Sequence, residues 1–447
     1  MISWRYPALG LPRFALLAAI LAAPVMDRQA VAQPSADAPL GQVLDSLCSA
    51  VEPRVIAWRR DIHQHPELSN REFRTAQLVA DHLKQLGLEV RTGVAHTGVL
   101  GILRGASADR VVALRADMDA LPVTERVDLP FASQVRAQYR GQEVGVMHAC
   151  GHDAHTAILM GVAEVLSQVS NRLPGTVKFI FQPAEEGAPA GESGGAPLMI
   201  REGVLEDPRP DAIFGLHVMP FTAGRFGCRP GPLMAGVDSL HIVIRGRQTH
   251  GALPWRGVDP IVVASQVVLG LQTVISRQVD LTAAPAVITI GSIQGGVREN
   301  IIPDEVQLRG TIRILSPDSR QEIHQRITRT AEKIAESAGG TAEVAIASGN
   351  PATVNDPELT QRMIPVLQTV FGPEAVTTVT PQTVAEDFSC YQQVVPGMFF
   401  YLGITPADTD PAQAAPNHSP HFFVDESALV AGVRALSHLA LAQLAGQ

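Results

Sequence analysis

Residues 111–119 read VVALRADMD, a short apolar run that ends in two carboxylates. Two further runs, TVKFIFQ (176–182) and AIFGLHV (212–218), are equally rich in Val, Ile and Phe. Such runs are typical of strands that are buried on both faces of a sheet. The helical pattern TAILMGVAEVLSQV (156–169) lies between the first two of them. This alternation of strands and helices predicts an α/β domain.

From about Gly231 the pattern changes to strand, helix, strand, strand, helix and strand. That order is typical of a four-stranded sheet with helices on one face, the ferredoxin-like βαββαβ arrangement. The first pattern resumes after Asn350. We therefore predict an α/β domain with a mixed sheet, interrupted by a smaller inserted domain. The expected parts are residues 33–230 and 349–447 for the first domain and 231–348 for the insert.

The N-terminus has the features of an export signal. Arg5 and Arg13 precede the apolar run FALLAAILAAPVM (14–26), and small residues in an A-x-A arrangement end at Ala32. A helix needs roughly 20 residues to span a bilayer, so a permanent membrane anchor is the weaker interpretation. We expect residues 1–32 to be cleaved and the protein to be periplasmic or secreted.

The charge of the chain excludes some partners. Its formal net charge is -9, and removing residues 1–32, with three Arg and one Asp, makes it -11. Nucleic acids and anionic lipids are bound by clustered Lys and Arg, so we expect neither a nucleic-acid partner nor a stable membrane anchor. The four cysteines lie far apart in the sequence, which is not the spacing of a disulfide-dense scaffold.

Chemically active side chains end or follow the predicted strands. Asp117 and Asp119 close the first run, Glu185 and Glu186 follow the second, and His217 lies near the end of the third. Open α/β sheets bind ligands in the crevice at the carboxyl ends of their strands. We therefore expect these side chains to form one site. Two adjacent acids are more often a solvated charge pair, but at a strand end they repel unless a cation is present.

The stretch MHACGHDAH (147–155) adds Cys150 and His152. A C-x-H pair in a loop can direct a thiolate and an imidazole to one metal centre, and Zn, Mn, Co and Ni all suit such ligands with carboxylates. The alternatives are a nucleophilic Cys with a His base and a buried structural Cys. His148 and His155 are expected to support the ligands rather than to be ligands. His63 and His65, in a helix that Pro66 ends, are expected to be structural.

Seven motifs in order resemble the M20 metallopeptidases, in particular the amidohydrolase branch that cleaves N-acyl amino acids, with its hippurate and auxin-conjugate hydrolases. The resemblance extends from about Val55 to about Ala440. The motifs are RADMDALP, MHACGHDAHTA, FQPAEEG, GLHV, THGALP, AEDFS and NHSPHFFVDE.

The resemblance implies roles for particular residues. It implies two divalent metal ions per subunit with the thiolate bridging them, Glu185 as the general base, and Asp119 as a residue that supports the site. His250, in the insert, corresponds to a lid histidine that reaches the oxyanion from the partner subunit of a homodimer, so the insert is expected to be a lid and dimerisation domain. Asn300 and Arg313 correspond to positions near the substrate carboxylate. The implied metal ligands are Cys150, His152, Glu186, His217 and His418.

The function that the resemblance implies is hydrolysis of the amide bond of a small N-acyl amino acid by an exported metal-dependent enzyme. A dipeptidase or aminoacylase of the same superfamily is the nearest alternative. A catalytically silent exported binding protein is a third hypothesis, which the intact Glu185 argues against. The stretch after Glu186, residues 187–203, is longer than in the commonest family pattern, and we expect it to form a loop at the rim of the cleft.

Overall fold

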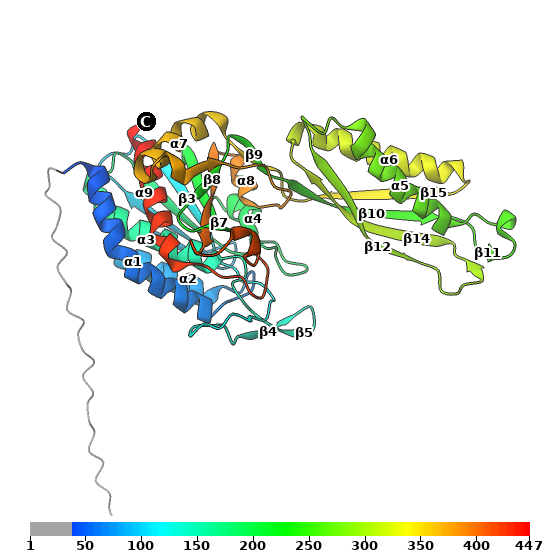
Figure 1. Cartoon of the computed structure of the whole chain (residues 1–447), viewed down its shortest axis with the longest axis horizontal. Coiled ribbons are helices and arrows are strands. Elements are labelled where there is room, and N and C mark those ends of the chain that lie inside the picture. The colour runs from blue at the N-terminus through cyan, green and yellow to red at the C-terminus, as the bar shows by residue number, and fades with distance from the viewer. Residues whose placement is uncertain (1–37) are drawn as a thin grey trace, which may run out of the picture. The chain divides into compact units, whose positions relative to one another are not determined.

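The computed structural model describes residues 38–447. The predicted export signal, residues 1–32, lies outside the described residues. Two sheets dominate the fold (Figure 1), and each has its own hydrophobic core.

The larger sheet has eight strands in the order β1-β2-β6-β3-β7-β18-β8-β17. Its centre, β6-β3-β7-β18, is parallel, whereas β1 and β2 pair antiparallel on one side and β18 pairs antiparallel with β8 on the other. The predicted mixed sheet is confirmed. The strands are β1 (Glu89–Val94), β2 (Gly98–Arg104), β3 (Val111–Asp117), β6 (Thr176–Gln182), β7 (Ala212–Thr222), β8 (Phe226–Cys228), β17 (Val376–Thr378) and β18 (Gly397–Thr405).

Helices cover both faces of this sheet. Strand β18 shows why, because Phe400 and Leu402 belong to one core while Phe399 and Tyr401 belong to the other. Successive side chains of a strand point to opposite faces, so an apolar run such as GMFFYLGIT needs a cover on each. The first face carries α1 (Leu40–Gln64), α2 (Phe73–Gln85), α3 (His152–Ser167), α7 (Pro357–Phe371) and α9 (Leu429–Ala445), and the second carries α4 (Gly195–Arg201) and α8 (Phe388–Gln392).

The second sheet is antiparallel, in the order β12-β14-β10-β15. Two helices pack on it and bury Val267 and Ile327 against Leu308 of its central strand. The chain order is the predicted βαββαβ, although the division into domains and the part played by the second sheet stay predictions. Its elements are β10 (Gly236–Arg245), α5 (Pro260–Gln278), β12 (Ala286–Gly295), β14 (Glu305–Ile314), α6 (Arg320–Ser337) and β15 (Thr341–Ser348).

Short strands complete the fold and connect its parts. The chain leaves the larger sheet through β9 and returns through β16, and these two strands pair with each other. Within the insert, β11 pairs with β13. The strands are β4 (Arg136–Tyr139), β5 (Gln142–Gly145), β9 (Gly231–Met234), β11 (Thr249–His250), β13 (Ile301–Ile302) and β16 (Thr353–Asn355).

One helix begins earlier than its apolar pattern predicts. The pattern starts at Thr156, whereas α3 starts at His152, and the backbone N–H groups of Ala154 and His155 donate to the carbonyl of Gly151. The extra turn, HDAH, is polar but buried. It carries no apolar periodicity because its side chains serve the site instead of the core.

Candidate metal centre and active site

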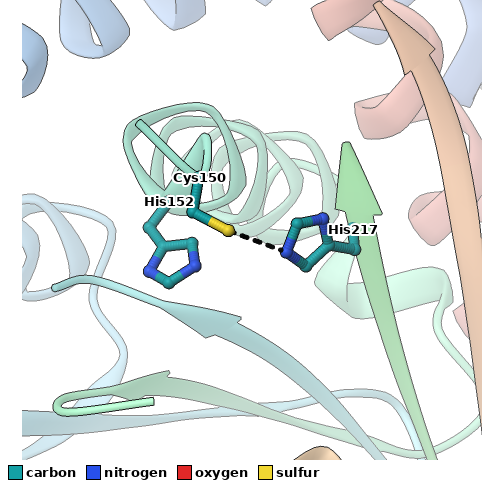
Figure 2. A group of neighbouring side chains, drawn as sticks. All are labelled: Cys150, His152 and His217. Carbon is teal, nitrogen blue, oxygen red and sulfur yellow. Dashed lines mark hydrogen bonds between the residues drawn. The ribbon is translucent and has the colours of Figure 1, made fainter. Parts of the chain in front are cut away.

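The ends of the parallel strands bring the predicted groups together. His217 lies on β7, Asp117 ends β3, and the glutamate pair follows β6. Cys150 and His152 come from the loop that opens α3, and their side chains lie near His217 (Figure 2).

Cys150 is common to two groups of potential metal ligands. In one group its sulfur lies with His152 and His217, and in the other with Glu186 and His418; the ligand atoms within each group are within 4.8 Å of one another. The Cys150 Sγ atom is 3.4 Å from Nε2 of His217 and 3.3 Å from Nε2 of His418. One thiolate that faces two ligand groups can serve two metal ions at once. The five predicted ligands are therefore brought together, with the sulfur between the two groups.

Hydrogen bonds hold the Nδ1 atom of two of these imidazoles and leave Nε2 facing the cluster. His217 donates from Nδ1 to the carbonyl of Val218 (2.8 Å), so Nε2 faces Cys150 unprotonated. His152 has Nδ1 3.3 Å from Oδ1 of Asp119, and its Nε2 is buried without any partner in the described chain. Such bonds to carboxylates and carbonyls are how proteins orient metal-binding histidines. The orphaned Nε2 of His152 fits a metal ion.

His155, in contrast, has no free nitrogen. Its Nδ1 lies 2.6 Å from Oδ1 of Asp117, and its Nε2 accepts the backbone N–H of Val218 (2.9 Å). His155 thus supports the site by fixing Asp117 and the end of β7. This placement agrees with the supporting role that we expected for it.

The electrostatics of the cluster also favour cations. Hydrogen bonds with Cys150 and Glu186 raise the pKa of His418 to about 10. Burial, together with the neighbouring carboxylates of Glu386 and Glu186, holds the pKa of Glu185 well above its usual range. Carboxylates crowded in this way repel one another unless positive charge lies between them. Divalent ions held by these residues would offset this excess of negative charge.

Two backbone features hold the ligands in place. Gly151 has φ +88°, and a Cβ atom there would meet Cγ2 of Val218 at 2.2 Å, so only glycine fits between Cys150 and His152. His418 also has a positive φ, 70°, and its backbone N–H donates to the carbonyl of Ala149 (2.7 Å). A non-glycine residue in this conformation is strained and needs such support.

A pocket of about 590 Å³ opens onto the ligand cluster. Of the three residues predicted in the insert, only Arg313 lines it. His250 and Asn300 are exposed at the β11–β13 pair, where the Gly251 N–H donates to the Asn300 carbonyl (2.8 Å), and neither lines this pocket. The action of His250 on a partner subunit's site stays a prediction. The lining residues include Cys150, Glu185, Glu186, His217, Met219, Met234, Arg313, Val384, Glu386 and His418.

The stretch after the glutamate pair, residues 187–203, is not a loop throughout, because α4 lies within it. None of its residues lines the pocket. Glu192 instead accepts hydrogen bonds from Arg71 (2.6 Å) and Asn70 (3.0 Å), and the bond with Arg71 holds the pKa of Glu192 down, at about 2. The loop is thus tied to the residues just before α2, and its expected position at the rim of the cleft stays a prediction.

Histidines outside the ligand set lie in a neighbouring buried network. His63 has Nδ1 2.8 Å from Asp153 and Nε2 3.0 Å from Glu125. His65 is partly exposed, with Nδ1 2.8 Å from the Asp61 carbonyl. His148 is buried, and both of its nitrogens lack a partner in residues 38–447. None of the three belongs to a group of potential metal ligands in the described chain.

A buried arginine at the base of the site was not among the predicted site residues. Arg115 donates to Asp117 (2.6 Å), Glu386 (2.9 Å) and Asp387 (2.9 Å). Glu386 lines the pocket and is only 2% exposed. An arginine inside an otherwise apolar buried strand must be paired with acids, so Arg115 in VVALRAD was a signal that acidic partners lie elsewhere in the chain.

A cluster of potential metal ligands beside a pocket that is lined by carboxylates fits a metal-dependent hydrolase. The chain belongs to peptidase family M20/M25/M40, which matches residues 113–442. Relatives described as an N-acetyl-L-cysteine deacetylase of Bacillus subtilis and an IAA-amino acid hydrolase of Arabidopsis thaliana fit the amidohydrolase branch of this family. The protein is an enzyme, and metal-dependent hydrolysis of amides is its general activity.

Relatives along nearly the whole chain agree with this class. A thermostable carboxypeptidase of Saccharolobus solfataricus is 40% identical over 395 residues, which cover 88% of this chain and 95% of the relative. An N-acetyl-L-cysteine deacetylase of Bacillus subtilis is 38% identical over 383 residues, which cover 86% of each chain. The crystal structure of a Bacillus subtilis protein described as a dinuclear metal binding peptidase from the M20 family has a TM-score of 0.75 and 35% identity, covering 89% of this chain and 99% of that one.

Proposed function

We propose that this enzyme hydrolyses the amide bond of N-acyl amino acids that carry a free carboxylate. The observation that carries the proposal is Arg313, which lines the pocket and has no carboxylate partner or side-chain hydrogen bond among residues 38–447. An unpaired guanidinium in a pocket rich in acids binds a substrate carboxylate. Met219, Met234 and Val384 supply apolar walls for the rest of the substrate.

The residues of the chain divide the reaction between them. Cys150, His152, Glu186, His217 and His418 would hold two divalent cations, which supply Lewis acidity for the carbonyl and acidify water. Glu185 takes the proton from the attacking water and returns it to the nitrogen that leaves. Arg313 holds the carboxylate and so fixes the amide relative to Glu185.

Cleavage of peptides at their carboxyl end is the second candidate, because one relative is a carboxypeptidase. Both activities break an amide on the nitrogen of an amino acid whose carboxylate is free. They differ in what lies on the acyl side: an acyl group without charge, or a peptide with an amino terminus.

A substrate panel tests the proposal. Purified protein supplied with Mn²⁺ is given three kinds of substrate. These are N-acetyl and N-benzoyl amino acids, the same compounds with the carboxylate converted to an amide, and unblocked dipeptides. We expect cleavage of the N-acyl amino acids, with loss of activity when the carboxylate is amidated. Preferred cleavage of the dipeptides would contradict the proposal and favour the second candidate.

We also propose that the enzyme is exported after cleavage near Ala32 and acts as a homodimer in which His250 reaches the site of the partner subunit. The apolar N-terminal run supports export, and the exposure of His250 away from its own pocket is compatible with action in the partner. Cell fractionation and light scattering test the two parts. A full-length cytoplasmic protein, or a monomer with full activity, would contradict them.

A further inference from the structure

One carboxylate in the pocket has no part in the reaction as described so far. Glu386 lines the pocket although it is 2% exposed. Its Oε1 atom accepts from Arg115 (2.9 Å) and from the backbone N–H of Phe388 (3.0 Å). Within the described residues Oε2 accepts no hydrogen bond, and it is not among the atoms sealed from the pocket. A buried carboxylate with one oxygen held and the other free is placed to accept a hydrogen bond from a ligand.

The distance between Glu386 and the base identifies the ligand atom. A carboxylate oxygen of Glu386 and one of Glu185 lie within 4.8 Å of each other. When one tetrahedral nitrogen donates two hydrogen bonds of ~2.9 Å, the two acceptor oxygens lie about 4.7 Å apart. A nitrogen that receives a proton from Glu185 is therefore within reach of Glu386 as well.

Amide hydrolysis produces such a nitrogen. The C–N bond breaks, a C–O bond forms from water, and the proton of that water passes through Glu185 to the nitrogen. The nitrogen then carries two hydrogens, its own and the one from Glu185. We propose that Glu386 is a second substrate-contacting carboxylate, which accepts the amide's own N–H and holds the leaving amine in line with Glu185. This inference rests on the proposed function, because it concerns the nitrogen of the cleaved amide.

A matched pair of substrates separates this role from a structural one. N-benzoyl-alanine and O-benzoyl-lactate differ only in that the ester has an oxygen where the amide has its N–H. Glu386→Gln keeps Oε1 for Arg115 and Phe388 but replaces the free Oε2 by an N–H donor. We expect E386Q to lower kcat/KM for the amide at least about tenfold more than kcat/KM for the ester, as loss of a hydrogen bond to a charged group does.

Asp387→Asn is the control variant. Asp387 receives the same Arg115 and lies beside Glu386, yet it does not line the pocket. D387N should therefore lower kcat/KM for the amide and the ester by the same factor. A thermal melt will show whether E386Q folds. If it does not, Glu386→Asp replaces E386Q in the comparison, because it keeps the charge beside Arg115 but withdraws the free oxygen from the pocket.

Equal losses on amide and ester in E386Q would overturn the inference and leave Glu386 as a partner of Arg115 only. Failure of the wild type to cleave N-benzoyl-alanine would instead overturn the proposed function, and the inference with it.

Discussion

Asp119 accepts the backbone N–H groups of both Glu185 and Glu186, one on each carboxylate oxygen, at 3.1 Å each. Its side chain is 1% exposed. One buried carboxylate thus fixes the proposed base and a proposed metal ligand relative to each other, and its position near Nδ1 of His152 extends this to a second proposed ligand.

Asp119→Asn should therefore reduce both metal affinity and turnover, because the amide group replaces one acceptor with a donor that faces a backbone N–H. Loss of such supporting bonds typically costs about 10- to 100-fold in metal affinity or activity. Steady-state kinetics and metal titration check this. Ser69→Ala, which removes only the 2.7 Å bond to Asp119, is the control and should cost less. Wild-type kinetics in D119N would contradict the role.

Glu185→Gln should lower kcat by about 10²- to 10⁴-fold, the usual contribution of a general base. The proposed metal ligands are untouched, so the metal content measured after dialysis should remain that of the wild type. Glu192→Gln makes the same chemical change on the anchored loop away from the pocket and should leave kcat near the wild-type value. Full turnover in E185Q would show that another group is the base.

Arg115 pairs with three buried carboxylates, so Arg115→Met should leave them without compensation. Removing one partner of a buried ion pair costs about 3–5 kcal/mol, which in a chain of this size corresponds to a Tm lower by roughly 4–6 °C. Arg115→Lys should recover part of the loss. Differential scanning fluorimetry measures both.

Arg104→Met is the matched control, because Arg104 also pairs with an acid, Glu89, but both side chains are more than half exposed. Its Tm should remain close to that of the wild type, since exposed ion pairs contribute little. An equal shift in the two methionine variants would contradict the importance of burial at Arg115.

Asp238 gives the second sheet a stability that depends on pH. Burial alone would raise its pKa, but hydrogen bonds from Arg320 and His324 outweigh burial and hold the pKa of Asp238 below its usual value. A carboxylate whose pKa is lowered on folding stabilises the fold above its unfolded pKa, about 3.9. That contribution is lost as the pH falls through the folded pKa.

Asp238→Asn should thus lower the free energy of unfolding at pH 7 by about 1–3 kcal/mol, the cost of leaving buried donors unsatisfied. The difference from the wild type should narrow below about pH 4, where the wild-type carboxylate takes up its proton. This is tested by measuring the melting temperatures of both proteins from pH 7 down to below pH 4. A difference that stays constant across this range would contradict the assigned titration.

Local patterns predicted the elements better than the contacts between them. The strand Thr176–Gln182 matches its predicted run residue for residue, and Val111–Asp117 begins with its run and ends two residues before it, since apolar runs bounded by polar groups are a local signal. The first turn of α3 was missed because its polar residues face the site. The motif order predicted that the five proposed metal ligands lie together, which their spacing alone leaves open.

The pairing of Arg115 with Glu386 joins residues 271 positions apart. No periodicity connects such positions, because the contact exists only once β3 and the segment before α8 are folded together. The sequence shows that a buried arginine needs acids, but it does not say which ones. For the same reason it grouped Arg313 with Asn300, whereas only Arg313 lines the pocket.

The most direct test of the central claim is the return of N-acyl amino acid hydrolysis as metal-stripped protein is titrated with Mn²⁺, with Zn²⁺ and Co²⁺ in parallel. We predict no turnover without metal and full activity at two ions per chain. Cys150→Ser should bind the ions less tightly. Cys228 is a buried cysteine outside both ligand groups, so Cys228→Ser should titrate like the wild type. Full hydrolysis by the metal-free protein, or wild-type titration by the Cys150 variant, would contradict it.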